Sequence, residues 1–322
     1  MRRRTLPVVA AVGVLALTAC TAAGEDASRD EPGEELVRVV ASFYPLQFVA
    51  EQVAGERAAV QNLTPAGAEP HDLELSPVDV LDLEDADLVL TLSGFQPALD
   101  DALAEVSGPV VLNTAEEAEH EHPEPDDSAD DGHTDEEHSE DEHSDDEHDH
   151  AGGDPHFWLD PTRLAHVADE VAEALTELDP DSADTYRTNA DALTTQLSTL
   201  DTEFTTSLTG CEQDVIVVSH EAFGYLADRY GLTQVGLAGI DPDAEPSPAR
   251  LQEIRDVVED EDVGTIFTES LVNPDVAEAL AAELGIDVAM LDPLEGLSDP
   301  SGDYLSVMRQ NLQTLRESLG CA

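Results

Sequence analysis

Residues 181–208 read DSADTYRTNADALTTQLSTLDTEFTTSL and form a long helical pattern in the middle of the chain. Its apolar side chains recur at steps of three and four, which places them on one helix face: Tyr186, Ala190, Leu193, Leu197, Leu200, Phe204 and Leu208. Such a helix is about 40 Å long. Gly210 ends it. Because it lies between two blocks of alternating strands and helices, we expect it to be a rigid connector.

The two flanking blocks have the same kind of pattern. The first has strand patterns at residues 37–42, 60–63, 86–91 and 110–112, separated by helical patterns at 45–53, 78–83 and 97–106. The second has strand patterns at residues 214–219, 234–237, 263–268 and 288–291, with helical patterns at 222–230, 248–259, 274–284 and 304–319. This alternation predicts an α/β fold with parallel sheets.

The N-terminus predicts export. Three arginines at residues 2–4 precede an apolar run at 6–17 that is too short to span a bilayer, as in a signal peptide. The run ends in LTAC, which resembles a bacterial lipobox and implies cleavage after residue 19 and lipid attachment at Cys20. The alternative is an ordinary signal peptide cut near Ala19. Residues 20–35 then form a lipid-anchored flexible tether, and the protein is extracytoplasmic, on the outer face of the cell membrane.

The charge of the chain excludes some partners. The 322 residues carry 73 acidic and 13 basic side chains, a formal net charge of −60. Such a surface repels nucleic acid and anionic lipid, so neither is an expected partner, whereas metal cations have the favourable sign. A high-salt habitat or a solubility bias is the plainer explanation of the charge.

A tract at residues 116–150 is dominated by Asp, Glu and His. His133, His138, His143 and His148 recur every five residues, so they share no helix face. High charge with almost no apolar residues predicts disorder, and the histidines favour a loose metal-binding loop. The alternative is an acidic insert that only solvates the protein.

Two cysteines remain beside Cys20. In an oxidising compartment, Cys211 and Cys321 are most simply a disulfide that fixes the C-terminus to the second block. The alternative is a pair of free thiols that bind metal.

Three histidines lie in separate, well-formed contexts: His71 in AEPHDLELSP, His156 in GDPHFWLDP and His220 in VVSHEAFGY. His220 directly follows a strand pattern, and ligands of open parallel sheets bind at the carboxyl ends of strands. Neutral imidazole is a ligand suited to zinc and its neighbours. A single such histidine would be an ordinary loop residue, but three of them indicate a shared metal site.

The motifs PHDLE, DPHFWLDP and HEAFGYLADRYGL resemble those of the cluster A-I solute-binding proteins of ABC importers, closest to the ZnuA-type zinc receptors. The resemblance covers roughly residues 36–322. It implies an N-terminal α/β lobe at 36–178, a linking helix at 179–209 and a C-terminal α/β lobe at 210–322, with the metal in a cleft between the lobes. It also implies a monomer that delivers Zn²⁺, as transported substrate, to a cognate permease and its ATPase.

The resemblance assigns ligands residue by residue. His71 and His156 come from the N-terminal lobe and His220 from the C-terminal lobe. The family places a carboxylate in the fourth position; Asp292, at a strand end, is preferred here, with Glu295 or a water as alternatives. Glu269 is expected to orient a ligand, or else to be a charge near a helix start, and Trp158 is expected to pack beside the site.

Zinc is favoured over manganese, because related manganese receptors carry a carboxylate where this chain has His220, and manganese prefers oxygen ligands. Three other functions compete: a receptor for manganese or another divalent metal, a secreted zinc hydrolase, and a surface adhesin or metal-buffering lipoprotein. No HExxH and no Ser or Cys nucleophile motif supports an enzyme.

Overall fold

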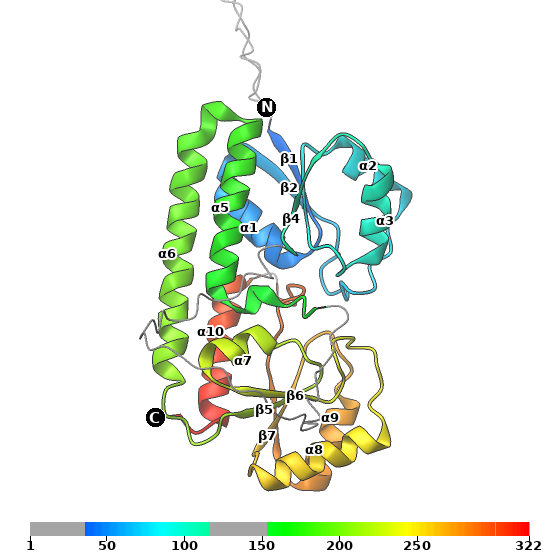
Figure 1. The fold of residues 1–322 in the computed structure, drawn as a ribbon, viewed down its shortest axis with the longest axis vertical. Helices are drawn as coiled ribbons and strands as arrows, with labels where there is room; N and C mark the ends of the chain where they lie inside the picture. Colours follow the sequence, from blue (N-terminus) through cyan, green and yellow to red (C-terminus); the bar gives the residue numbers. More distant parts are fainter. Residues whose placement is uncertain (1–35, 116–152, 300, 322) are drawn as a thin grey trace, which may run out of the picture. The chain divides into compact units, whose positions relative to one another are not determined.

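Two four-stranded sheets with the same strand order, β2-β1-β3-β4 and β6-β5-β7-β8, form the framework of the protein (Figure 1). The computed structural model describes residues 36–115, 153–299 and 301–321. The first sheet contains β1 (Val37–Ala41), β2 (Ala58–Asn62), β3 (Leu88–Thr91) and β4 (Val110–Asn113). The second contains β5 (Val215–Val218), β6 (Thr233–Gly236), β7 (Thr265–Thr268) and β8 (Asp287–Met290).

All strand pairs in both sheets are parallel, so the predicted α/β fold class is confirmed. The inner strands β3, β5 and β7 are buried along their whole length. This explains why their sequences are nearly continuous apolar runs rather than alternating ones. We call the elements around the first sheet the first lobe and those around the second sheet the second lobe.

Helices connect the parallel strands. The first lobe contains α1 (Tyr44–Ala54), α2 (Pro77–Asp85) and α3 (Pro97–Glu105). The second contains α7 (Gly224–Tyr230), α8 (Pro248–Asp260), α9 (Asp275–Leu284) and α10 (Tyr304–Ser318). Ser76 and Ser247 precede α2 and α8 and cap these helices by accepting hydrogen bonds from the Asp79 and Arg250 backbone N–H groups. The helix predicted from residue 222 begins at Gly224, because the backbone N–H of Ala222 instead donates to the His220 carbonyl in a turn.

The connector is α6 (Ala183–Ser207), which follows a short turn of 3₁₀-helix at Pro180–Ser182. All seven predicted apolar positions at 186–208 are buried. Helix α6 packs against α5 (Pro161–Leu178), against α1 of the first lobe and against α10 of the second. Its apolar stripe therefore contacts elements of both lobes, as a rigid connector requires.

The predicted disulfide between Cys211 and Cys321 is present, so the alternative of two thiolate metal ligands is wrong. Cys211 lies after α6 and Cys321 after α10. The backbone N–H groups of Glu212 and Gln213 also donate to the Leu319 carbonyl, at 3.0 and 3.1 Å. The end of the described chain is thereby held to the start of the second lobe.

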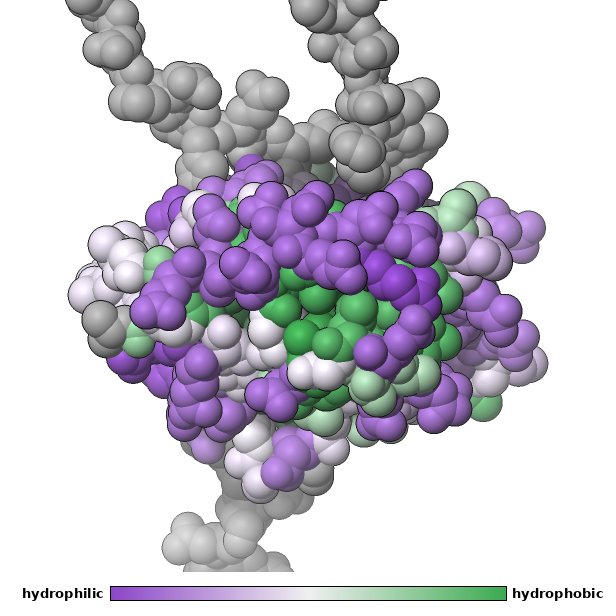
Figure 2. All heavy atoms as spheres, turned by 90° about the horizontal axis from the view of Figure 1, so that it is seen from below, coloured by the Kyte–Doolittle hydropathy of each residue, from purple (hydrophilic) through white to green (hydrophobic). Residues whose placement is uncertain are grey.

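The described surface is mainly hydrophilic. Figure 2, which looks at the end near α8, shows polar side chains around an area of apolar ones. Two large apolar side chains that are exposed, Val288 and Met290, belong to the edge strand β8. Among the described residues, none of the helices has the length and apolarity to cross a membrane.

Three predictions fall on residues outside the described ranges. These are the signal peptide at 1–19, the tether with its lipidation site at Cys20, and the His-rich tract at 116–150.

Candidate metal centre

His71 lies in the loop between β2 and α2. The loop is held from inside by Gln96, a buried residue whose side-chain amide donates to the Pro70 carbonyl at 3.1 Å and to the Thr64 hydroxyl at 3.0 Å. The backbone N–H of His71 donates to Glu69 Oε1 at 3.1 Å. The ring packs against the Phe95 ring with a centroid distance of 4.6 Å. These contacts fix the direction of the imidazole.

His156 is fully buried, just before the 3₁₀-helix Phe157–Leu159 that leads into α5. The backbone N–H of His156 donates to Asp154 Oδ1 at 2.9 Å, and the same oxygen lies 2.7 Å from His156 Nδ1. Trp158 is buried beside this ring, with centroids 5.2 Å apart, as predicted. Asp154 is a functional residue that the sequence reasoning missed, although the closely spaced Asp-x-His of GDPHFWLDP offered the signal.

His220 is fully buried and lies just beyond the end of β5, with Ser219 between them, so its predicted place at a strand end is confirmed. Its partner is Glu269, which follows β7, the neighbouring strand. The backbone N–H of His220 donates to Glu269 Oε1 at 3.1 Å, and Nδ1 lies 2.6 Å from Oε2. The expected role of Glu269 as an orienting residue therefore agrees with its contacts.

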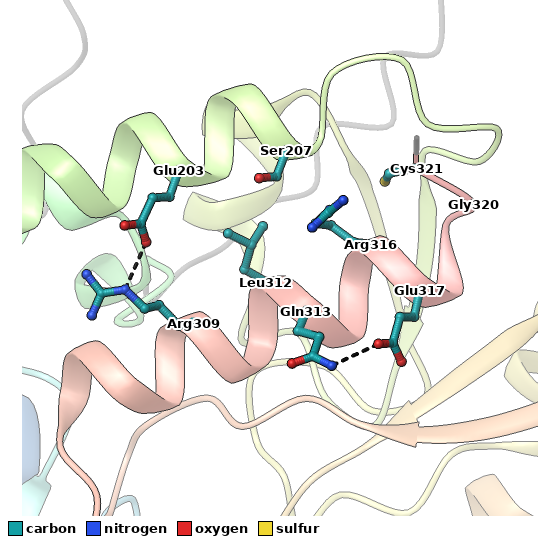
Figure 3. A pocket seen from close by; sticks show the side chains of 9 residues that line it. All are labelled: Glu203, Ser207, Arg309, Leu312, Gln313, Arg316, Glu317, Gly320 and Cys321. Atoms are coloured by element: carbon teal, nitrogen blue, oxygen red, sulfur yellow. Dashed lines mark hydrogen bonds and ion pairs between the residues drawn. The ribbon is translucent and has the colours of Figure 1, made fainter.

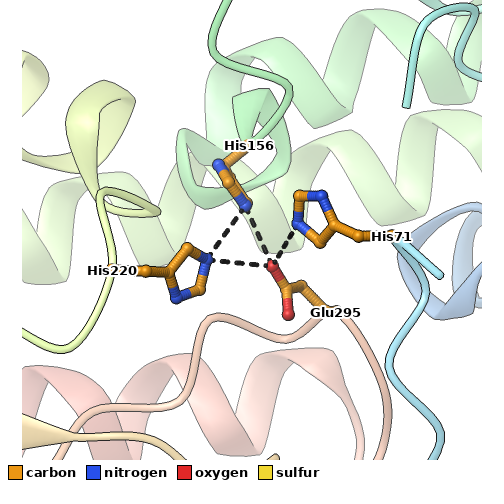
Figure 4. Close-up of side chains that lie close together, drawn as sticks. All are labelled: His71, His156, His220 and Glu295. Atoms are coloured by element: carbon orange, nitrogen blue, oxygen red, sulfur yellow. Dashed lines mark hydrogen bonds and ion pairs between the residues drawn. The ribbon is translucent and has the colours of Figure 1, made fainter. Parts of the chain in front are cut away.

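Glu295 supplies the carboxylate, from the loop after β8. Its Oε1 lies 3.2 Å from His71 Nε2, 2.9 Å from His156 Nε2 and 3.2 Å from His220 Nε2 (Figure 4). The loop is fixed by the Trp158 indole, whose Nε1–H donates to the Pro293 carbonyl at 2.8 Å. The four side chains are the one group of potential metal ligands found among the described residues.

The preference for Asp292 as the fourth ligand is corrected. Asp292 Oδ1 accepts from the Leu294 backbone N–H at 2.8 Å, and Oδ2 accepts from the Ser270 hydroxyl at 3.3 Å. The carboxylate therefore caps the turn after β8, and the chain reverses at Leu294, whose φ is +60°. That reversal aims Glu295 at the three imidazoles. The strand-end argument selected this loop, but Glu295 rather than Asp292 is the residue that faces the three imidazoles.

The electrostatics of the cluster follow from burial and close pairing. Burial alone would lower the pKa of His220, but its hydrogen bonds with Glu269 and Glu295 raise that pKa to about 10. The pKa of His156 is also raised, because Asp154 and Glu295 outweigh its burial. Burial alone would raise the pKa of Glu295, yet the three imidazoles hold it well below its usual range. The carboxylate is therefore ionised.

The outer carboxylates determine which ring nitrogens face the centre. A carboxylate can only accept, so His156 and His220 carry a proton on Nδ1 toward Asp154 and Glu269. Their Nε2 atoms face the centre, 3.4 Å from each other, and in the metal-free chain a proton on Nε2 of His220 is shared with Glu295. A metal cation that displaces this proton would meet the Nε2 lone pairs and the carboxylate, and a ligating imidazole with its other nitrogen on a carboxylate is the usual arrangement in zinc sites.

The four ligand atoms lie close enough together to surround one small ion. Metal–ligand bonds of about 2.0–2.1 Å place tetrahedral ligand atoms about 3.3–3.4 Å apart. Glu295 Oε1 lies 2.9–3.2 Å from the three imidazole Nε2 atoms, the Nε2 atoms of His156 and His220 are 3.4 Å apart, and all four ligand atoms lie within 4.8 Å of one another. The donor set and its close spacing therefore suit a small, four-coordinate divalent metal.

Access to the cluster is from one side. The His71 side chain is 16% exposed, whereas those of His156, His220 and Glu295 are fully covered. A pocket of about 350 Å³ borders His71 and is lined by residues of both lobes, among them Phe95 and Tyr225. Ala115 and Gly153, the residues that flank the undescribed segment, also line it.

A larger hollow of about 630 Å³ lies away from the cluster, between α6 and α10, where the Arg309 side chain donates a hydrogen bond to Glu203 at 2.8 Å (Figure 3).

The fold and the site together define a class of metal-binding receptor: two parallel α/β lobes joined by a long helix, with imidazoles from both lobes around one point. The chain belongs to the ZnuA family, whose profile, described as zinc-uptake complex component A, periplasmic, matches residues 39–318. It is 33% identical to the high-affinity zinc uptake system protein ZnuA of Bacillus subtilis, over 97% of this chain and 96% of that one.

Solved structures agree with this assignment. The Zn(II)-bound AdcA of Streptococcus pneumoniae is similar with a TM-score of 0.70 and 29% identity, over 89% of this chain but 58% of AdcA. The chain also spans only 56–60% of the curated AdcA relatives it matches. The laminin-binding protein Lmb of Streptococcus agalactiae, described as a bifunctional protein with adhesin and metal transporting activity, has a TM-score of 0.73 and 33% identity, over 88% of this chain and 99% of that one.

Proposed function

We propose that this protein is an extracytoplasmic zinc receptor that binds one Zn²⁺ through His71, His156, His220 and Glu295. It then delivers the ion to the permease and ATPase of an ABC importer. The observation that carries the proposal is the convergence of three imidazole nitrogens and one carboxylate oxygen within 4.8 Å of one another, the donor set of a four-coordinate zinc site. Membership of the ZnuA family, whose proteins are binding proteins rather than enzymes, supports it.

Zinc is preferred over manganese because of the donor set. Three imidazoles and one carboxylate suit tetrahedral zinc, whereas manganese prefers more oxygens and a higher coordination number. Copper would also bind this set tightly, so selection against it depends on metal supply. Two ligands come from each lobe, so separation of the lobes would break the coordination and release the ion.

The test is a competition titration on the full-length chain after its metal has been removed. A chromophoric chelator in excess suppresses weak sites, so that only a tight site is counted. We expect one tight zinc per chain, and strongly weakened binding after alanine substitution of any of the three histidines. Wild-type affinity in all three single variants would refute the site.

We further propose that the tract at 116–150 binds additional zinc weakly and is dispensable for the tight site. The composition of the tract, dominated by Asp, Glu and His, supports this. The sequence predicts that this segment lacks a fixed structure, and a metal site in such a segment must order the chain to form, so we expect weak binding. Deleting residues 119–150 should lower the total zinc bound without weakening the tight site. Unchanged total zinc would reduce the tract to a solvating insert.

Attachment to the membrane is proposed through a lipid on Cys20. The lipobox-like LTAC at residues 17–20 supports it. A Cys20→Ala variant should appear in the soluble extracellular fraction, whereas the wild type remains with membranes. Equal distribution of the two would favour an ordinary signal peptide.

A second candidate function is adhesion, favoured by the likeness to Lmb. The two functions separate in experiment. Loss of the gene should impair growth only in zinc-depleted medium if the protein serves import. Laminin binding by the purified chain, unaffected by alanine at His156, would instead support an adhesin.

A further inference from the structure

Asp154 contacts both lobes. Through Oδ1 it holds His156, accepting from the backbone N–H at 2.9 Å and lying 2.7 Å from Nδ1. Its backbone carbonyl accepts a hydrogen bond at 3.2 Å from the hydroxyl of Tyr225, a residue of α7 in the second lobe. The Tyr225 ring in turn lies under the guanidinium of Arg163, with 4.6 Å from Cζ to the ring centroid.

The other carboxylate oxygen of Asp154 is pressed against Gly224, the first residue of α7. A Cβ added to Gly224 would overlap Asp154 Oδ2, at a separation that real Cβ atoms do not show. The φ of Gly224 is not in the left-handed region, so space rather than backbone conformation requires glycine there. Helix propensity alone would favour alanine at this position.

The Asp154 side chain cannot simply turn away from an added methyl group. Its Oδ1 is engaged twice with His156, and only 20% of the side chain is exposed. Rotation that moves Oδ2 off Gly224 also moves Oδ1 off the imidazole. The orientation of His156 therefore depends on how closely α7 approaches.

His220 is held differently. Its orienting carboxylate, Glu269, follows β7, which pairs directly with the strand that precedes His220. Both residues belong to the second lobe, so their contact does not depend on the other lobe. Of the two buried imidazoles, only His156 has an orienting residue that is itself fixed from across the interface.

We propose that Asp154 is a positioning residue that makes the alignment of His156 conditional on contact with Gly224 and Tyr225 of the second lobe. The proposal rests on the zinc-binding function proposed above. When α7 is docked, His156 Nε2 is directed at the ion; when α7 moves away, Asp154 loses its support and His156 becomes the first ligand to disengage. Zinc release is thereby coupled to separation of the lobes through one carboxylate.

The test is a double-substitution cycle in the full-length chain, read by zinc affinity and zinc dissociation rate in the chelator competition. Asp154→Ala should weaken binding about 10–100-fold, as loss of such an orienting partner does. Gly224→Ala should weaken binding and speed dissociation because it displaces Asp154. In the double variant, Gly224→Ala should add no further loss, because the carboxylate it would displace is gone.

Three controls separate positioning from damage to the fold. Gly264→Ala is the matched glycine variant, since nothing lies within 4 Å of a Cβ there, and it should bind zinc as the wild type does. Asp154→Asn keeps the size and an acceptor oxygen and should lie closer to wild type than Asp154→Ala. Melting temperatures of the metal-free variants show whether α7 has been destabilised.

Wild-type zinc affinity in Gly224→Ala would overturn the inference. So would a double variant whose affinity loss equals the product of the Asp154→Ala and Gly224→Ala losses, because the two defects would then be independent. If Gly224→Ala melts early, wild-type affinity in Asp154→Ala overturns it instead. A wild-type chain without a tight site would refute the proposed function, and this inference with it. A tight wild-type site with unaffected variants refutes this inference alone.

Discussion

The two lobes have sheets of identical order but supply their ligands in different ways. In the second lobe, His220 lies just beyond the end of β5, and Glu269 after β7 aligns it within the same sheet. In the first lobe, both ligands lie on loops away from strand ends: His71 beyond a loop that Gln96 holds, and His156 after the undescribed segment. The second lobe thus presents a ligand fixed by its own sheet, whereas the first depends on loop contacts, some of them from across the interface.

The largest expected effect comes from removing a ligand of the second lobe. Glu295→Ala removes the oxygen that contacts all three imidazoles, and we expect zinc affinity to fall by more than about 100-fold, beyond the usual cost of losing an orienting partner. Asp292→Asn is the matched control on the same loop: it keeps an acceptor oxygen for the Leu294 backbone N–H, which the turn needs, and should retain tight binding. Competition titration compares them. Tight binding by the Glu295 variant with loss in the Asp292 variant would restore Asp292 as the ligand.

A smaller effect is expected at Glu269. Glu269→Gln keeps the size of the side chain but removes the charge that stabilises the Nδ1–H of His220. We expect zinc affinity to fall about 10–100-fold. Because Glu269 lies in the same lobe as its histidine, the loss should combine with Gly224→Ala as an independent defect, multiplying the two fold-changes. If the affinity losses of Glu269→Gln and Gly224→Ala do not multiply in the double variant, His220 and His156 are not aligned independently.

The pH dependence of stability gives a moderate effect. Burial alone would lower the pKa of His220, but its contacts with Glu269 and Glu295 raise that pKa to about 10. In the metal-free protein, the charged imidazole therefore stabilises the fold, and this contribution is complete below the unfolded-state pKa of about 6.5. That stability is lost as pH rises toward 10, whereas zinc-bound His220 has no such proton to lose. The zinc-induced rise in melting temperature should therefore be larger at pH 8 than at pH 6. Scanning calorimetry measures it; an equal rise at both values would contradict the pairing.

The smallest effect on zinc affinity is expected from breaking the disulfide. Its cysteines follow α6 and α10, away from the four candidate ligands. Cys321→Ser opens a loop with a sequence separation of 110, and the chain-entropy estimate for such a loop is about 4–5 kcal/mol of stability. The melting temperature should fall while zinc affinity at low temperature stays unchanged. Loss of zinc binding in this variant would mean that the lobe cannot hold His220 without the crosslink.

The sequence predicts the fold well, because local patterns determined it. The apolar stripe of α6 spans seven positions, and each is buried. Parallel inner strands such as β5 must be apolar on both faces, so they stand out in the chain. Ser-Pro pairs at the starts of α2 and α8 are local signals of the same kind, since the serine caps the helix and proline is tolerated in its first turn.

The site was predictable only in part, because its details depend on loop backbones. His220 is set by the end of a strand, a position that a pattern reveals. The choice between Asp292 and Glu295 depends on a turn in which Leu294 adopts a φ of +60°, and a leucine gives no sequence signal for that conformation. The role of Asp154 depends on Gly224, 70 residues away along the chain, which only the folded structure brings together.

The most direct test of the central claim is the anomalous difference map of zinc-bound crystals, measured at the zinc absorption edge. The expected result is one strong peak between the lobes, about 2.0–2.2 Å from Nε2 of His71, His156 and His220 and from an oxygen of Glu295. A main peak bound by Asp292, or one that lacks His220 of the second lobe or His156 of the first, would contradict it.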